Sequence, residues 1–122
     1  MEINFNSKSP IYIQVMDSIK KEIASGILKN GDKLLSVRDM SQKIKVNPNT
    51  IQRAYNELER EEIAYTQRGM GTFVTRDSQK IKGIKKSMAF EIVNSFIKGM
   101  RSLGFSDEDI VQIIKESIMG EK

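Results

Sequence analysis

The segment that follows residue 46 places apolar and polar residues with the period of a helix. Its apolar positions fall on one side of such a helix, at Ile51, Ala54, Tyr55 and Leu58. Asn47 precedes the segment as a suitable N-cap, and Pro48 takes the first helical position, where its missing N–H has no cost. The pattern predicts a short helix from Pro48 to about Leu58. Its outer side carries amides, a hydroxyl and an arginine, and its acidic residues begin only at Glu57.

The N-terminal part of the chain predicts an extended arm followed by a helix. Residues 1–8 alternate apolar and polar positions, as an arm lying along a surface would. Ser9 is a suitable cap for the helix, Pro10 takes its first position, and Gly26 ends it.

A second helix is predicted between the first helix and Pro48. Ser36 caps it, and it runs to about Ile44. Only residues 45–47 then separate it from the helix at Pro48, which is the spacing of a helix-turn-helix unit. In such a unit the second helix enters the DNA major groove while the first crosses the backbone.

The hydrophobic period changes after Glu61. Residues 63–66 and 72–75 predict two strands, joined by a glycine-bearing loop at residues 67–71. Residues 33–35 predict a further brief strand. A hairpin directly after a helix-turn-helix is a wing, and Arg68 lies at its tip, where it could reach a sugar-phosphate edge.

Two C-terminal helices are predicted, over residues 81–103 and from the cap Ser106 onward. Together they carry more apolar surface than two helices can bury against each other. We therefore expect a second copy of the chain to cover this surface, although the helices could instead fold back onto their own winged domain. The residues expected in the dimer interface are Met88, Ile92, Phe96, Met100, Ile110 and Ile114.

The predicted fold is mostly α with a small β wing. Residues 1–76 form a winged helix-turn-helix domain, and residues 77–122 form a helical dimerisation segment. Residues 76–80 contain no apolar side chain, so they are interpreted as a flexible link that lets two DNA-reading heads change their separation.

Composition narrows the functional classes. The net charge is +4 and the pI about 9.3, which favours an anionic partner. The chain contains no cysteine or histidine, which argues against disulfides, thiol or imidazole catalysis and zinc, and no cofactor is expected. It shows no signal-peptide pattern and no apolar run long enough to cross a membrane, so a cytoplasmic location is expected.

The polar side chains of these elements favour DNA as the partner. Asn, Gln, Thr and Arg are the residues that read base edges in a major groove. Arg38 lies in the first turn of the crossing helix, although it could instead pair with Asp39 or Asp32 on the surface. The outer face of the helix at Pro48 could likewise be an ordinary solvated face. Three features nevertheless occur together and favour DNA: a capped amide-rich helix, an arginine in the helix before it, and a basic glycine-bearing loop after it.

The motifs resemble the GntR family of bacterial transcription regulators. The resemblance lies in residues 31–40 (GDKLLSVRDM), 46–55 (VNPNTIQRAY), 58–59 (LE) and 69–74 (GMGTFV). The chain departs from the family pattern at Leu35, where proline is usual, at Glu62, where glycine is usual, and at Gln52, often a basic position. The short C-terminal segment is similar to that of the YtrA subfamily, whose two terminal helices form the dimer.

The resemblance implies a dimeric repressor that binds an inverted-repeat operator in double-stranded DNA and controls a nearby transport operon of the ATP-binding-cassette type. A small-molecule effector is possible but not identified. The residues expected to contact DNA are Ser36, Arg38, Asn47, Asn49, Thr50, Gln52, Arg53, Arg68 and Gly69. The alternative is a winged-helix module that holds a protein or RNA without operator specificity. An enzyme is not expected, because the acidic clusters fall at helix ends, where they act as capping or solvated charges.

Overall fold

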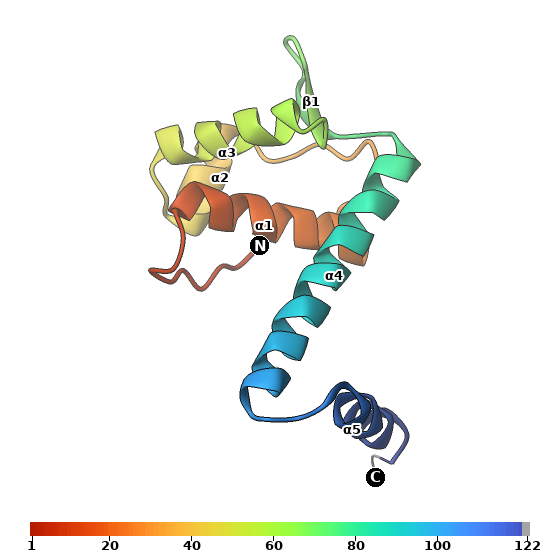
Figure 1. Cartoon of the computed structure of the whole chain (residues 1–122). Coiled ribbons are helices and arrows are strands. Elements are labelled where there is room, and N and C mark those ends of the chain that lie inside the picture. The colour runs from red at the N-terminus through yellow and green to blue at the C-terminus, as the bar shows by residue number, and fades with distance from the viewer. Residues whose placement is uncertain (121–122) are drawn as a thin grey trace. The chain divides into compact units, whose positions relative to one another are not determined.

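The computed structural model describes residues 1–120, in which a two-stranded sheet follows three helices and precedes two more (Figure 1). In chain order the elements are α1 (Ile11–Ser25), α2 (Val37–Ile44), α3 (Pro48–Arg60), β1 (Ala64–Gln67), β2 (Gly71–Val74), α4 (Ser78–Ser102) and α5 (Asp107–Met119). The predicted fold class, mostly helical with a short wing, is confirmed. The chain forms two compact units, Met1–Lys85 and Lys86 onward, so α4 belongs to both. The functional division between residues 76 and 77 stays a prediction.

The first unit is built around α3, which packs against α1, α2 and β1. The largest fully buried side chains are Tyr55, Ile19, Ile51, Leu58, Val15 and Val74. The Tyr55 hydroxyl donates a hydrogen bond to the carbonyl of Leu35 at 2.7 Å, and burial raises the pKa of this phenol, which therefore remains a neutral donor. The entry to α2 is thus held by a hydrogen bond at Leu35, the position where the family pattern has proline.

The predicted caps of α2 and α3 are confirmed. Ser36 Oγ accepts a hydrogen bond from the backbone N–H of Asp39 at 3.0 Å. Asn47 Oδ1 accepts from the N–H of Asn49 at 2.8 Å, and Pro48 is the first residue of α3. Each cap satisfies an N–H that has no partner within its own helix, which fixes where these two short helices begin.

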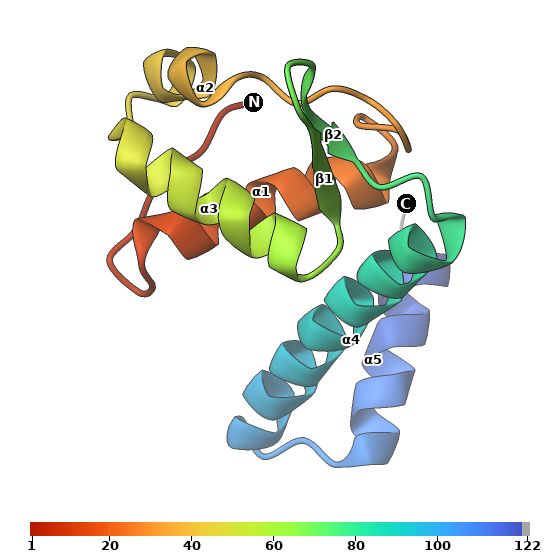
Figure 2. The ribbon, with the colours of Figure 1, turned by 90° about the horizontal axis from the view of Figure 1, so that it is seen from above.

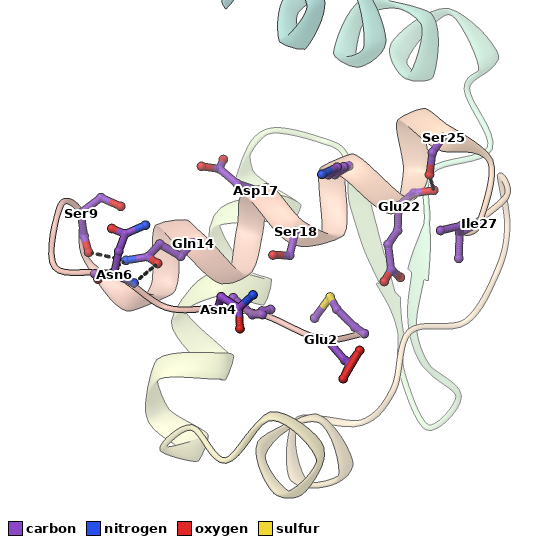
Figure 3. Close-up of a pocket in the computed structure, with 13 residues that line it drawn as sticks. Glu2, Asn4, Asn6, Ser9, Gln14, Asp17, Ser18, Glu22, Ser25 and Ile27 are labelled. Atoms are coloured by element: carbon purple, nitrogen blue, oxygen red, sulfur yellow. Dashed lines mark hydrogen bonds between the residues drawn. The ribbon is translucent and has the colours of Figure 1, made fainter. Parts of the chain in front are cut away.

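The start of α1 differs from the prediction by one residue. Pro10 rather than Ser9 is the cap, because the N–H groups of Ile13 and Gln14 both donate to the Pro10 carbonyl. The buried Gln14 amide ties down the arm by donating to the carbonyls of Asn6 and Ser9 and accepting from the N–H of Asn6. Figure 3 shows these bonds beside a hollow of about 520 Å³ between the arm and α1.

The wing is an antiparallel pair in which Ala64 lies opposite Val74 and Gln67 opposite Gly71. Each strand is displaced by one residue from its predicted position. The expected third strand is reduced to a bridge between Lys33 and Phe73, flanked by a hydrogen bond from the N–H of Leu34 to the Thr72 carbonyl at 2.8 Å. The wing is therefore fastened to the segment before α2 as well as to the end of α3.

Glu62 adopts a left-handed backbone conformation, with φ +62°, at the turn between α3 and β1. A non-glycine residue in this conformation destabilises the folded state by about 1–2 kcal/mol. Glycine would remove this strain, but its greater flexibility in the unfolded chain would offset about 0.5–1 kcal/mol of the gain in stability. We expect Glu62→Gly to raise the free energy of unfolding by about 0.5–1 kcal/mol. Denaturant titration measures the change, and Glu62→Ala, which removes the same carboxylate but keeps the strain, should show no such rise. A lower midpoint for Glu62→Gly would contradict the expectation.

The connection between the wing and α4 is shorter than predicted. α4 begins at Ser78, and Asp77 Oδ1 accepts from the N–H groups of Gln79 at 2.9 Å and Lys80 at 3.3 Å. The interpretation of residues 76–80 as a flexible link is therefore wrong for residues 78–80, which form the first turn of a capped helix. Sequence polarity suggested a linker, but a helix start is polar for the same reason, since its N–H groups need acceptors.

The second unit contains the remainder of α4 and the whole of α5. α5 begins with the predicted capping box, in which Ser106 Oγ accepts from the N–H of Asp109 and the Asp109 carboxylate accepts from the N–H of Ser106. Ile110 is only 4% exposed, but most apolar residues of this unit are exposed. Within residues 1–120 we find no helix with the length and apolarity needed to cross a membrane.

Candidate nucleic-acid interface

The face of α3 opposite the core is polar and exposed. It carries Asn49, Gln52, Arg53 and Asn56. Gln52 Nε2 donates to Asn56 Oδ1 at 2.8 Å, which pairs two amides one turn apart. The remaining amide groups of this pair offer both a donor and an acceptor to a neighbouring molecule. That combination is the one that Asn and Gln use to read adenine edges in a major groove.

The N-terminus of α3 suits a negatively charged partner. Its first turn contains no acidic residue, so the positive end of the helix dipole is not neutralised there. Asn47 uses its Oδ1 for capping, which leaves its amide nitrogen as the group that can donate to DNA. Ser36 at the start of α2 can likewise cap its helix and contact DNA at the same time. Its Oγ accepts the capping hydrogen bond, and its hydroxyl hydrogen remains free to be donated. Thr50, also in the predicted set, is half-buried.

Arg38 is exposed in the first turn of α2. No ion pair joins it to Asp32 or Asp39 in the part of the chain that the structure describes, so the surface-pair explanation finds no support. A cation near a helix N-terminus is also disfavoured by the helix dipole. The position of Arg38 is therefore not explained by the stability of its own helix.

The wing tip presents Arg68 and Gly69 to solvent. Gly69 has φ +78°, which allows the tight turn closed by the hydrogen bond from the N–H of Met70 to the Gln67 carbonyl at 2.8 Å. The wing is also tied to α3, because the Thr66 hydroxyl donates to Glu59 at 2.6 Å. This bond restricts how far the tip can move relative to the exposed face of α3.

Lys33 lies against the wing and was not predicted to take part in the site. A Cβ atom placed on Gly71 would lie 2.7 Å from Lys33 Cε, so the lysine stem runs directly over this glycine. The backbone bridge from Lys33 to Phe73 fixes the contact. Nothing in the sequence separates Lys33 from the other lysines, because the contact exists only once residues 31–34 lie beside β2.

Arg53 makes a contact that the sequence did not suggest. Its guanidinium carbon lies 3.9 Å from the ring centroid of Tyr12, which belongs to the first turn of α1. This is a close cation–π arrangement between two helices. Tyr12 was not among the predicted residues, since tyrosine in an apolar helix pattern is usually a core or boundary residue.

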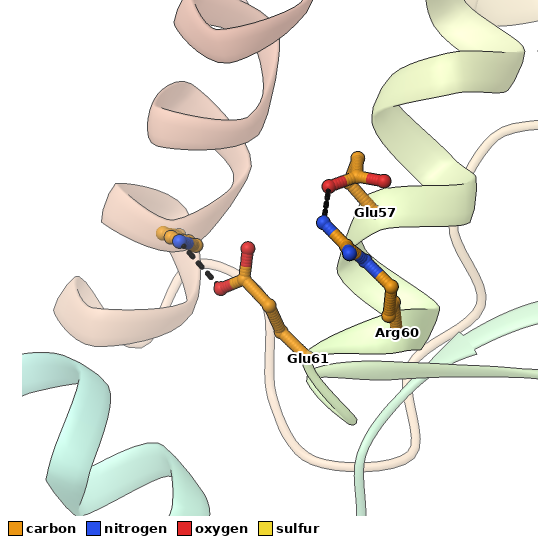
Figure 4. A network of polar contacts seen from close by, with 4 residues as sticks. Glu57, Arg60 and Glu61 are labelled. Carbon is orange, nitrogen blue, oxygen red and sulfur yellow. Dashed lines mark hydrogen bonds and ion pairs between the residues drawn. The ribbon is translucent and has the colours of Figure 1, made fainter.

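The acidic residues at the end of α3 have structural roles. Glu61 forms an ion pair with Lys20 of α1 at 2.9 Å, and Glu57 pairs with Arg60 one turn later (Figure 4). The acidic residues of α3 all lie in its C-terminal half, so its N-terminal half has no carboxylate of its own. Glu61 therefore ties the far end of α3 to α1, whereas Glu57 is paired within α3 itself.

The nine predicted DNA-contacting residues all fall in the first unit, on α2, on α3 with its cap, and on the wing. α3 packs against both α2 and β1, so one core positions the three elements (Figure 2).

Comparison with known proteins agrees with this arrangement. The profile described as "Bacterial regulatory proteins, gntR family" matches residues 11–74. The chain is 42% identical to the uncharacterized HTH-type transcriptional regulator YhcF of Bacillus subtilis, over 94% of this chain and 95% of the relative. It is 38% identical to the HTH-type transcriptional repressor YtrA of Bacillus subtilis, over 95% of this chain and 90% of the relative.

Solved structures show the same relationship. A GntR family transcriptional regulator from Listeria monocytogenes superposes with a TM-score of 0.85 and 44% identity, covering 92% of this chain and 98% of that chain. The DNA-binding domain of AraR in complex with operator ORX1 superposes with a TM-score of 0.55 and 26% identity, covering 62% of this chain and 95% of that chain. The relatives are regulators rather than enzymes, as expected. The chain belongs to the GntR family, with YtrA among its full-length relatives, and is a DNA-binding transcriptional regulator.

Proposed function

We propose that the protein is a dimeric repressor that binds an inverted-repeat operator, with one winged helix-turn-helix reading each half-site. The observation that carries the proposal is the uncovered apolar surface of α4 and α5, in a chain whose other unit presents a DNA-reading face. A two-fold dimer places two such faces on a two-fold operator.

The exposed fractions show how much apolar surface the single chain leaves in contact with water. Ile92 is 71% exposed, Leu103 72% and Ile118 74%. The exposure of several large apolar side chains on the same two helices is typical of an interaction surface.

The proposed interface comprises the predicted residues together with their exposed apolar neighbours. Ile92, Phe96 and Ile114 are exposed, and Met88 and Met100 are half-buried, so a partner can cover all five. Ile110 is already buried in the single chain, and in the proposed dimer it supports the interface from within.

The proposed DNA contacts follow from the geometry of each residue. The Gln52–Asn56 pair and Asn49 read base edges, while Arg38, Arg68 and Gly69 meet the backbone on either side. Ser36, Asn47 and Thr50 donate to phosphates from the starts of α2 and α3. The protein acts in the cytoplasm, where the bacterial chromosome lies.

The repressor role is proposed from the printed name of the Bacillus subtilis relative YtrA. Control of a transport operon, including the ATP-binding-cassette type, is proposed from the subfamily resemblance alone. A small-molecule effector, if one exists, would act by favouring one arrangement of the two heads over another.

The test measures binding to a labelled duplex carrying the inverted repeat nearest this gene, and to a shuffled duplex of the same composition. We expect the operator to bind at least about 10³-fold more tightly than the shuffled duplex at physiological salt, with affinity falling steeply as salt rises. Equal affinity for both duplexes, or binding insensitive to salt, would favour a protein- or RNA-holding module instead.

A further inference from the structure

The cation–π contact between α1 and α3 bears on which side chains of the site contact phosphates and which contact bases. Arg53 is exposed and Tyr12 is half-buried, and the guanidinium carbon lies 3.9 Å from the ring centroid. At this distance the ring covers one face of the guanidinium. The N–H groups lie in the plane of the guanidinium, so stacking leaves them available as a fork of donors.

The Arg53 charge is not neutralised by the nearest acid of its own helix. Glu57, the nearest acid along α3, is instead paired with Arg60. A guanidinium fork held in place by an aromatic ring fits a carboxylate or a phosphate, which it can bind through two parallel hydrogen bonds. On a DNA-binding unit the matching group is a backbone phosphate.

The same contact separates Arg53 from base reading. An arginine that reads guanine must extend away from the protein into the groove. The Arg53 guanidinium instead lies over the ring of Tyr12 on α1, whereas Gln52 and Asn56 form an amide pair on the exposed face of α3. The arginine is held at the border of that face, where a groove is lined by phosphates.

We propose that Tyr12 is a positioning residue that holds Arg53 as a phosphate clamp at the edge of α3, and that base reading is left to the amide side chains. The proposal rests on the DNA-binding function proposed above. By holding the guanidinium in its binding orientation before DNA arrives, the ring reduces the ordering cost of the contact.

The test is a double-mutant cycle of wild type, Tyr12→Leu, Arg53→Ala and the double variant, with Tyr12→Phe as the control that keeps the ring. Each dimer is titrated with the operator duplex, with operators carrying single base-pair substitutions, and with the shuffled duplex, over a range of salt. Thermal melting checks that each variant is folded.

A phosphate clamp predicts a defined pattern. Arg53→Ala should weaken binding to every duplex by a similar factor and reduce the slope of log affinity against log salt by about 1 per half-site. Tyr12→Leu should weaken binding about two- to fivefold in the wild-type background and not at all when Arg53 is absent. Tyr12→Phe should bind as wild type does.

Several results would overturn the proposal. Equal weakening by Tyr12→Leu with and without Arg53 would show a structural role only. Loss of discrimination at one base pair in Arg53→Ala would make Arg53 a base reader. The shuffled duplex distinguishes a failure of the phosphate clamp from a failure of the proposed function. If the wild type binds both duplexes equally, operator recognition is refuted. A phosphate contact by Arg53 would still be tested in that case, because Arg53→Ala should weaken binding to both duplexes. A wild type that binds neither duplex refutes both proposals.

Discussion

Replacement of Ile92 with glutamate is expected to convert the dimer into monomers and to reduce operator affinity by about 10²- to 10⁴-fold. Ile92 is 71% exposed in the single chain, so a monomer can accept the charge without disturbing its core. In the dimer the same carboxylate would be buried without a partner, which is strongly unfavourable. In a dimer, binding of one winged domain to its half-site brings the other to a high effective concentration at the second half-site. Monomers lose this effect, and its loss accounts for the expected drop in affinity of about 10²- to 10⁴-fold.

The control for this variant lies on the same helix. Asn94 is exposed on the polar side of α4, so Asn94→Glu adds the same charge while leaving the apolar face intact. Sedimentation velocity should give a monomer for Ile92→Glu and a dimer for Asn94→Glu, with only the first losing operator affinity. A wild-type chain that sediments as a monomer at micromolar concentration would refute the dimer, and dimeric Ile92→Glu would place the interface elsewhere.

The second large effect is expected from Arg38→Ala. Arg38 is exposed and in no ion pair with Asp32 or Asp39 within the described residues, so its removal should leave the fold unchanged. If it contacts DNA, each half-site should lose about 1–3 kcal/mol of binding free energy, which is about 5- to 150-fold in affinity. Fluorescence anisotropy with the labelled operator measures the loss. Arg68→Ala at the wing tip should act in the same direction.

Arg60→Ala is the matched control. It removes an equal charge from the same unit, but at the C-terminal end of α3, where Arg60 pairs with Glu57. Its effect on operator affinity should be small and confined to the general loss of positive charge. Equal losses for Arg38→Ala and Arg60→Ala would mean that net charge, rather than a placed contact at Arg38, determines affinity.

Local chemistry explains why much of the fold could be read from the sequence. Asn47 before Pro48 and Ser36 before Asp39 specify helix starts, because the first-turn N–H groups need acceptors within reach. Gly69 specifies the wing turn because the backbone there has a positive φ. The ordered motifs in residues 31–74 then sufficed to predict the winged helix-turn-helix and the family.

Other features depended on contacts between segments distant in the chain. The stacking of Arg53 on Tyr12 and the passage of Lys33 over Gly71 each join residues that no periodic pattern relates. The start of α4 was missed because a polar helix start and a polar linker have the same composition. Most helices and strands of residues 1–120 could therefore be predicted from the sequence, since capping and periodicity act over a few residues. The stacking and pairing of the polar side chains could not be predicted, because these contacts depend on how α1, α3 and the wing pack together.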